Sequence, residues 1–179
     1  EKIEENNGII ANPNCSTIQM VLALKPIYEE AGIKRLVVST YQAVSGTGKK
    51  AVDELQKQVQ DYVEHKELNS EVYPHQIAFN VLPHIDIFFD NGYTKEEMKL
   101  VNETRKILDD SELAISSTAA RIPVFYGHAE SVNVETETRI EVDRLKEILD
   151  ATAGVKVVDD PEKNLYPLPL DSEKDDSVM

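Results

Sequence analysis

The apolar residues of this chain follow two patterns, one typical of helices and one typical of strands. Between Lys50 and His65, apolar side chains recur every three or four residues, which places them on one face of a helix. Between Ile33 and Thr40 the chain is instead rich in β-branched residues. The same criteria predict helices over 15–31, 50–65, 94–108 and 141–151, and strands over 8–11, 33–40, 77–82, 85–89, 113–119, within 125–139 and over 155–158.

Local signals refine the helix boundaries. Pro26 is expected to kink or shorten the first helix, because proline lacks the N–H group and clashes with the preceding turn. Gly32 and Gly154 are placed to end the first and last helices. Thr94, followed three residues later by Glu97, is a capping-box pattern and marks the start of the third helix.

Long alternating strands mixed with helices predict an α+β fold. We expect a mixed, largely antiparallel sheet with helices packed on one face. One domain is expected over residues 8–170, which the family resemblance described below identifies as a catalytic and dimerisation domain, with a linker or cut edge at 1–7 and a truncated or poorly ordered tail at 171–179. No dinucleotide-binding glycine fingerprint precedes Cys15, so a Rossmann domain for NADP is not expected within the chain.

The amino-acid composition limits the kinds of molecule that the chain is expected to bind. The net charge of −14 argues against nucleic acid, although a few Arg and Lys residues can still form a pocket for a small anionic substrate. The single cysteine excludes an intrachain disulfide and a multi-cysteine zinc site, and it fits a reducing, cytoplasmic compartment. No apolar run approaches the roughly 20 residues needed to cross a bilayer. We therefore expect no nucleic-acid, membrane or metal partner.

That single cysteine, Cys15, follows a short apolar run and a Pro-Asn break, and it precedes an amphipathic helix. A thiol at a helix N-terminus lies near unpaired backbone N–H groups and the positive end of the helix dipole, which stabilise a thiolate. Free cysteine is also often a small buried apolar side chain. From this stretch alone, Cys15 can be interpreted either as a nucleophile or as a residue of the core.

Two further residues have a chemical and an ordinary interpretation. His128 follows a glycine ahead of a predicted strand, where it could serve as the base for a thiol or be an unremarkable histidine. Arg121 follows a strand of small and apolar residues. Its bidentate partner there is either a carboxylate on a substrate or an acidic side chain of the protein.

Three other features are weaker. Glu96 and Lys99 share a helix face, as a solvated ion pair also would. Gln42 ends a predicted strand and could orient a reacting carbonyl, although loop glutamines are usually inert. The SGTG sequence at 45–48 could let a phosphate or a nicotinamide approach the backbone. It is not a P-loop, because no GKS or GKT follows it.

Taken together, these segments resemble the aspartate-semialdehyde dehydrogenase family. The active-site segment of that family resembles GIIANPNCST at 8–17, and NPNCST followed by R-x-P-x(4)-H is a specific combination. Further similar blocks occur in family order, namely STYQAVSGTG (39–48), IAFNVLPHID (77–86), EEMKLVNETRKIL (96–108), RIPVFYGHAESVNVE (121–135) and, more weakly, NLYPLPLD (164–171).

The resemblance implies a fold like the C-terminal domain of glyceraldehyde-3-phosphate dehydrogenase-like enzymes. It implies the conversion of L-aspartyl 4-phosphate to L-aspartate 4-semialdehyde with NADPH and release of phosphate, in the biosynthesis of lysine, methionine and threonine. By the same resemblance, Cys15 is the nucleophile that forms a thioester, His128 is the general acid/base, and Gln42 holds the acyl group in line. A homodimer, or a dimer of such dimers, is also implied.

The remaining site residues follow from the same motifs. Arg121 is expected to bind the α-carboxylate of the substrate and Glu96 its amino group. Lys99 and Asn14 are expected to bind the departing phosphate. Near the nicotinamide of NADP, the resemblance places Ser45, Gly46 and Gly48.

The chain also departs from the family pattern. The family's nucleotide-binding domain is not among these 179 residues, so little or no activity is expected from the chain alone. The segment 65–72 is shorter than the family's loop there. Two alternatives remain: an enzyme like N-acetyl-γ-glutamyl-phosphate reductase, whose segment is closer to NPGC, and a non-catalytic dimerisation module with a structural cysteine.

Overall fold

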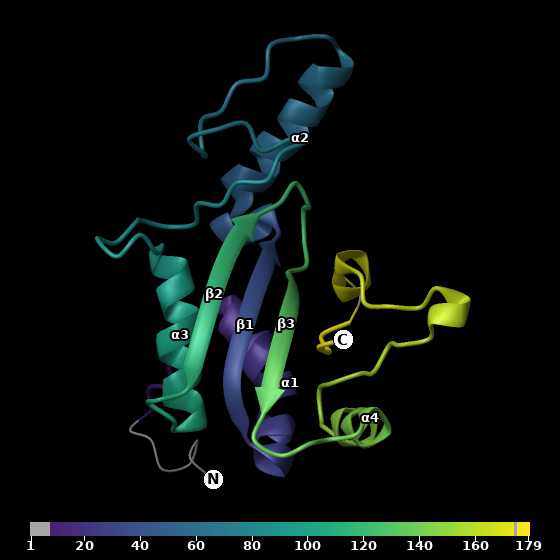
Figure 1. Cartoon of the computed structure of the whole chain (residues 1–179). Coiled ribbons are helices and arrows are strands. Elements are labelled where there is room, and N and C mark those ends of the chain that lie inside the picture. The colour runs from purple at the N-terminus through teal and green to yellow at the C-terminus, as the bar shows by residue number, and fades with distance from the viewer. Residues whose placement is uncertain (1–7, 174) are drawn as a thin grey trace.

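A computed structural model describes residues 8–173 and 175–179. The described residues form three strands and four α-helices, joined by long loops and short 3₁₀ turns (Figure 1). In chain order the elements are α1 (Cys15–Ala31), β1 (Ile33–Gln42), the 3₁₀ turn η1 (Val44–Thr47), α2 (Lys49–Val63), α3 (Lys95–Leu108), β2 (Ala114–Arg121), β3 (Ala129–Thr136), α4 (Val142–Asp150), η2 (Pro161–Lys163) and η3 (Pro169–Glu173).

The sheet has the order β2-β1-β3, so the first strand of the chain lies at its centre. β1 pairs in parallel with β2, with Gln42 opposite Arg121 at the ends of the two strands. It pairs antiparallel with β3, with Leu36 opposite Val134. The mixed sheet and its helices confirm the predicted α+β fold.

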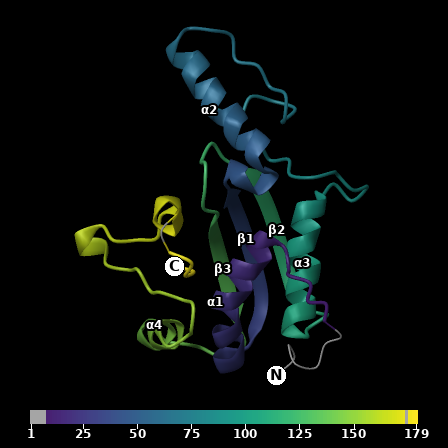
Figure 2. The same ribbon diagram turned by 180° about the vertical axis from the view of Figure 1, so that it is seen from behind.

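Helices α1 and α3 cover one face of the sheet, as Figure 2 shows from behind. The main core lies between them and the sheet, because alternate residues of β1 point to that side. Its buried members are Met20, Leu24, Ile27, Ile33, Leu36, Val38, Leu100, Leu108 and Leu113. No described helix crosses the opposite face in Figure 1, so the prediction of helices on one face is confirmed.

Helix α2 and the loop after it form an arm that extends beyond the end of the sheet (Figure 1). The arm has a smaller core of its own, made of Val44, Ala51, Leu55, Ile77, Ala78 and Leu82. Two buried polar side chains of α2 fix the irregular loop. Gln58 accepts from the N–H groups of Ile77 and Ala78, and Glu54 accepts from those of Glu71 and Val72.

Several predicted strands do not form. Residues 8–14 contain no strand, and 77–82 and 85–89 contribute single bridges at Leu82 and Phe88. Left-handed backbone at Phe79 (φ 63°) and Asp86 (φ 68°) breaks the extended conformation of the last two segments. The segment 155–158 pairs only through the bridge between Val155 and Val178.

The helix boundaries agree better with expectation. The capping box of Thr94 and Glu97 is present at the start of α3, which confirms that prediction. Pro26 lies inside α1, yet the helix continues to Ala31. The predicted end at Ala31 is confirmed, and of the kink or shortening expected at Pro26 the shortening does not occur. Packing of Met20, Leu24 and Ile27 against the sheet holds α1 together through the proline.

Candidate active site

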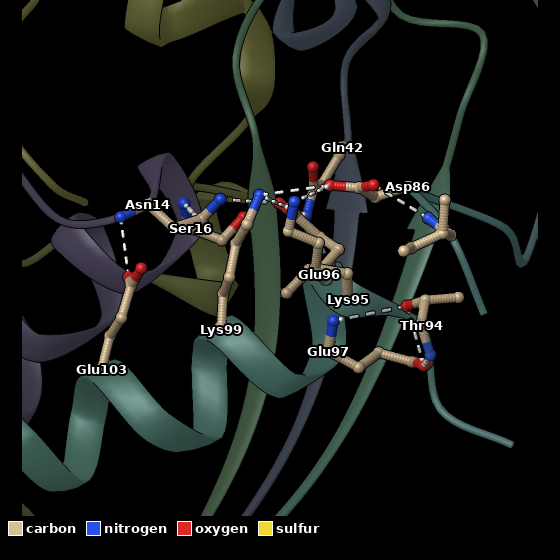
Figure 3. Close-up of polar contacts among 12 residues, drawn as sticks. Asn14, Ser16, Gln42, Asp86, Thr94, Lys95, Glu96, Glu97, Lys99 and Glu103 are labelled. Carbon is tan, nitrogen blue, oxygen red and sulfur yellow. Dashed lines mark hydrogen bonds and ion pairs between the residues drawn. The ribbon is translucent and has the colours of Figure 1, made fainter. Parts of the chain in front are cut away.

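Cys15 is the first residue of α1, and Asn14 caps that helix. The side-chain oxygen of Asn14 accepts a hydrogen bond from the N–H of Ser16 at 3.1 Å, as an N-cap should. Cys15 is exposed, while the next residues, Ser16 and Thr17, are fully buried. An exposed thiol therefore stands directly before two buried residues at the start of the helix, whose cap Asn14 is drawn in Figure 3.

The surroundings of Cys15 do not lower the pKa of its thiol overall. Desolvation raises the pKa, and the nearby carboxylate of Glu96 raises it further. Hydrogen bonding from Ser16 at the helix start and the positive charge of Arg121 act in the opposite direction but are outweighed. The helix N-terminus thus stabilises a thiolate, as the sequence predicts, but does not by itself produce a thiolate at neutral pH.

Glu96 lies at the centre of the polar cluster in Figure 3. It is 5% exposed, although it stands in the first turn of α3. Its Oε1 accepts from Asn14 Nδ2 at 2.9 Å and from Gln42 Nε2 at 3.2 Å. Its Oε2 lies 3.3 Å from Lys99 Nζ. One carboxylate therefore joins the start of α1, the end of β1 and the face of α3.

Lys99 lies between two acids. Its ammonium group is 3.5 Å from Asp86 as well as 3.3 Å from Glu96, and Asp86 is also 3.7 Å from Lys95. Partial burial lowers the pKa of Lys99, but the two carboxylates together outweigh that effect, so this pKa lies above its usual value. The side chain is therefore a stable cation that faces the cluster.

Arg121 ends β2 beside Gln42, because the two strands run in parallel. Its side chain is buried, and Nη1 donates to the carbonyl of Ala43 at 2.7 Å. Its Nε is buried without a hydrogen-bond partner among the described residues. A buried guanidinium with an unused donor is an arrangement that a carboxylate ligand would complete.

His128 is held by the backbone of the segment after β1. Its Nδ1 accepts from the N–H of Ala43 at 3.0 Å, so the neutral ring carries its proton on Nε2. Burial lowers the pKa of His128, the charge of Arg121 lowers it further, and Glu96 opposes both. His128 is thus a neutral imidazole at pH 7 that offers Nε2–H as a donor.

The two glycines within residues 45–48 have different surroundings. A Cβ atom on Gly46 would lie 2.8 Å from Arg121 Nη1 and 3.1 Å from His128 Nε2, so this glycine lets both side chains reach the backbone. Gly48 has φ +104° and open space beside it. An open pocket of about 400 Å³ is lined by Ser45, Gly48, Lys49, Val52 and Tyr126.

The predicted site residues therefore meet in one region. Glu96 contacts Asn14, Gln42 and Lys99 directly, and its charge acts on both Cys15 and His128. Arg121 and His128 both border Gly46. Ser45 and Gly48, which are predicted to lie near the cofactor, line the open pocket described above. Within the described chain, no group of three or more His, Cys, Asp and Glu side chains is arranged to hold a metal ion.

Sequence reasoning missed three contributors. The backbone of Ala43 holds both Arg121 and His128, and a hydrogen bond to the backbone cannot be predicted from the type of residue that makes it. Asp86 reaches Lys99 from a loop whose conformation was not predicted. Glu103 lies seven residues after Glu96 and accepts from the N–H of Asn14 at 2.7 Å. The spacing of Glu96, Lys99 and Glu103 on one helix face was the signal available for the last.

Residues 24–179 match the family model of the semialdehyde dehydrogenase dimerisation domain, and the chain belongs to that family. Among curated relatives, it is 57% identical over 176 residues to the aspartate-semialdehyde dehydrogenase of Aquifex aeolicus, covering 98% of this chain and 52% of the relative. The chain spans about half the length of the curated relatives it matches.

Solved structures give the same result. Aspartate semialdehyde dehydrogenase II of Vibrio cholerae, in complex with ASA, is 51% identical with a TM-score of 0.81, covering 84% of this chain and 45% of that one. The enzyme of Candida albicans with NADP is 29% identical with a TM-score of 0.56, covering 82% and 37%. None of the described helices is long and apolar enough to cross a membrane.

Proposed function

We propose that this chain is the catalytic and dimerisation part of an aspartate-semialdehyde dehydrogenase. The reaction is the reductive dephosphorylation of L-aspartyl 4-phosphate to L-aspartate 4-semialdehyde with NADPH. The observation that carries the proposal is the sharing of Glu96 Oε1 by Asn14 and Gln42, beside the thiol of Cys15 and the guanidinium of Arg121. Residues from α1, β1, α3 and β2 are thereby gathered around one nucleophile.

In the first step, the sulfur of Cys15 attacks the acyl carbon of the substrate, the acyl–phosphate bond breaks, and phosphate leaves with the electron pair and takes up the thiol proton. The product is a thioester on Cys15. Gln42, fixed by Thr40 and Glu96, is suited to hold the acyl oxygen. Lys99 and the side-chain amide of Asn14 supply positive charge and a donor for the phosphate.

Substrate recognition uses the two charges buried beside the thiol. Arg121 binds the α-carboxylate, which would occupy its unused Nε donor. Glu96 binds the amino group, since its Oε2 already lies 3.3 Å from one ammonium group, that of Lys99. A small molecule that carries both groups and a phosphate matches this arrangement of charges.

His128 acts as the general acid/base. Because Ala43 N–H occupies Nδ1, the neutral ring donates a hydrogen bond through Nε2–H, which suits stabilisation of an oxyanion formed from the thioester carbonyl. The lowered pKa of His128 keeps the ring neutral, so no buried cation forms beside Arg121. The oxyanion re-forms a carbonyl as the bond to the sulfur of Cys15 breaks, which releases the aldehyde.

Bound NADPH supplies the hydride that reduces the thioester. The residues fit its nicotinamide end, because Ser45 and Gly48 line an open pocket next to Gly46, which itself borders His128. A relative of known structure was solved with NADP. We propose that a nucleotide-binding domain outside these 179 residues holds the rest of the cofactor, and that the chain alone has little or no activity.

The assembly is proposed to be a homodimer, in keeping with the dimerisation-domain family. Its location is proposed to be the cytoplasm, where reducing conditions keep the single thiol of Cys15 free. Residues 8–170 would form the domain, with 171–179 as its tail.

The central test replaces Cys15 by alanine in the full-length protein that contains this chain. Turnover of aspartate semialdehyde, phosphate and NADP is expected to disappear, because no other group in the cluster can carry the acyl chain. The exposed control Ile18→Ala, one turn further along α1, is expected to retain the wild-type rate. Retention of a tenth of the wild-type rate by Cys15→Ala would remove the thiol from the mechanism. Robust turnover by the 179-residue chain alone would contradict the need for a second domain.

A further inference from the structure

The helix face that carries Glu96 and Lys99 has a third polar member, Glu103, which none of the proposed steps uses. Glu103 stands one turn beyond Lys99 on α3 and points toward the start of α1 (Figure 3). Its Oε2 accepts a hydrogen bond from the backbone N–H of Asn14 at 2.7 Å. The two residues are 89 positions apart in the sequence, so the contact is a tertiary one.

Asn14 is consequently held at all of its polar groups. Its N–H is bound by Glu103, its side-chain amide by Glu96, and its side-chain oxygen caps α1 through Ser16 N–H. Its carbonyl accepts from the N–H of Ile18 at 2.9 Å, as the first hydrogen bond of α1. The helix therefore fixes the peptide that joins Asn14 to Cys15, and Glu103 fixes the peptide before it, where the chain enters the helix. Together these two main-chain contacts set the direction in which the thiol leaves the helix.

We infer that Glu103 is a positioning residue for the Cys15 nucleophile. It holds the Pro13–Asn14 peptide, one residue before the thiol, at its N–H group, while Glu96 is left free to exchange its partners for the substrate. This role rests on the proposed function of Cys15. The neighbouring segment is not part of the sheet, since residues 9–14 contain no strand. The carboxylate of Glu103 supplies a hydrogen bond to the backbone of this segment, which the hydrogen bonds of a strand would otherwise have supplied.

The test compares four variants of the full-length protein. Glu103→Ala removes the acceptor, Glu103→Gln keeps an uncharged acceptor at the same reach, and Glu103→Asp keeps the charge but withdraws it by one methylene. Asn102→Ala, at the exposed neighbouring position of α3, is the control. Three quantities are measured: hydrogen exchange in the segment 12–16 by mass spectrometry, the rate of iodoacetamide modification of Cys15, and kcat and KM.

Glu103→Ala and Glu103→Asp are expected to speed exchange in that segment about tenfold or more, since a hydrogen bond to a charged group is lost. They should lower kcat about 10- to 100-fold with KM changed less than threefold, because the substrate contacts remain while the nucleophile is misplaced. Glu103→Gln should restore most of kcat, and Asn102→Ala should match the wild type. If Glu103→Ala fails to fold, Glu103→Asp supplies the same comparison.

Two results would overturn the inference. One is an exchange rate in Glu103→Asp equal to that of Asn102→Ala, which would mean that the contact does not hold the segment. The other is an equal loss of kcat in Glu103→Gln and Glu103→Ala, which would assign the effect to charge alone. These outcomes are separate from the fate of the proposed function, because exchange in the segment reports on Glu103 even if Cys15→Ala proves active.

Discussion

Two buried glutamates of this protein have almost the same exposure and opposite surroundings. Glu54 in the arm is 8% exposed and accepts from two backbone N–H groups, those of Glu71 and Val72, at 2.6 Å each. Glu96 in the site is 5% exposed, and its contacts are with the side chains of Asn14, Gln42 and Lys99. A carboxylate bound to backbone fixes the shape of a loop. A carboxylate bound to side chains holds groups that a ligand can displace.

Substitution of Glu96 tests this difference between the two glutamates most directly. Glu96→Gln is expected to lower kcat/KM of the full-length protein about 100-fold, because a charged hydrogen-bond partner worth roughly 1.5–3 kcal/mol is lost. Steady-state kinetics provide the measurement, and Glu54→Gln is the matched control, an equally buried acid that should keep the wild-type rate within twofold. An equal loss of kcat/KM in Glu96→Gln and Glu54→Gln would show that the two glutamates do not differ in their role.

Glu130 on β3 is a third poorly solvated acid. Burial raises its pKa to about 7, which the hydrogen bond from Gln19 only partly offsets, and its Oε2 has no partner in the described structure. A raised pKa in the folded state stabilises the protein below the unfolded value near 4.5, and that contribution is lost as pH rises through 7. Glu130→Gln should therefore be more stable than the wild type by about 2–3 kcal/mol at pH 8.

Urea unfolding at pH 5 and pH 8 checks this sign. The difference between Glu130→Gln and the wild type should be much smaller at pH 5, where both side chains are neutral in the folded state. A difference independent of pH would mean that Glu130 is already ionised when folded. His128 does not interfere, because it titrates in both proteins alike.

Removing the carboxylate of Glu54 in the arm should lower the stability of the protein and leave the reactivity of Cys15 unchanged. Glu54→Ala is expected to lower the free energy of unfolding by about 2 kcal/mol, because two loop N–H groups lose a charged acceptor. The rate of Cys15 alkylation should stay within twofold of the wild type. Asp53→Ala, whose ion pair with Lys49 is exposed, is the control and should change stability by less than about 0.5 kcal/mol.

The smallest effect is expected at the edge of the site. Asp86→Asn should tighten phosphate binding about threefold, because Lys99 loses a competing carboxylate in an exposed ion pair worth less than about 1 kcal/mol. Asparagine tolerates the left-handed backbone of this position, so the loop should persist. The KM for phosphate in the oxidative direction is the measurement, with exposed Asp90→Asn as control. Weaker phosphate binding would assign Asp86 to shaping the loop instead.

Hydropathy patterns predicted the helices and the three sheet strands well, because the core faces of α1, α3 and β1 repeat regularly. They failed where backbone is extended without pairing, as at 77–82, since local composition does not record whether a partner strand exists. The site residues came mainly from short motifs. Asp86 and Glu103 were missed because an acid on a helix or loop surface looks the same whether it faces solvent or a peptide 89 residues away.

The placing of the earliest strand at the centre of the sheet has a kinetic consequence. β1 cannot gain either neighbour until the ribosome has made β2 and β3, which pair with it from residues 114–121 and 129–136. Contacts between such distant positions form slowly, because a long loop must close before any pairing compensates for the lost entropy. Cys15 is therefore synthesised well before Glu96 and Arg121, and it acquires these neighbours late in folding. Because the thiol completes its surroundings only when α3 and β2 are in place, its reactivity would report when this part of the nascent chain has folded.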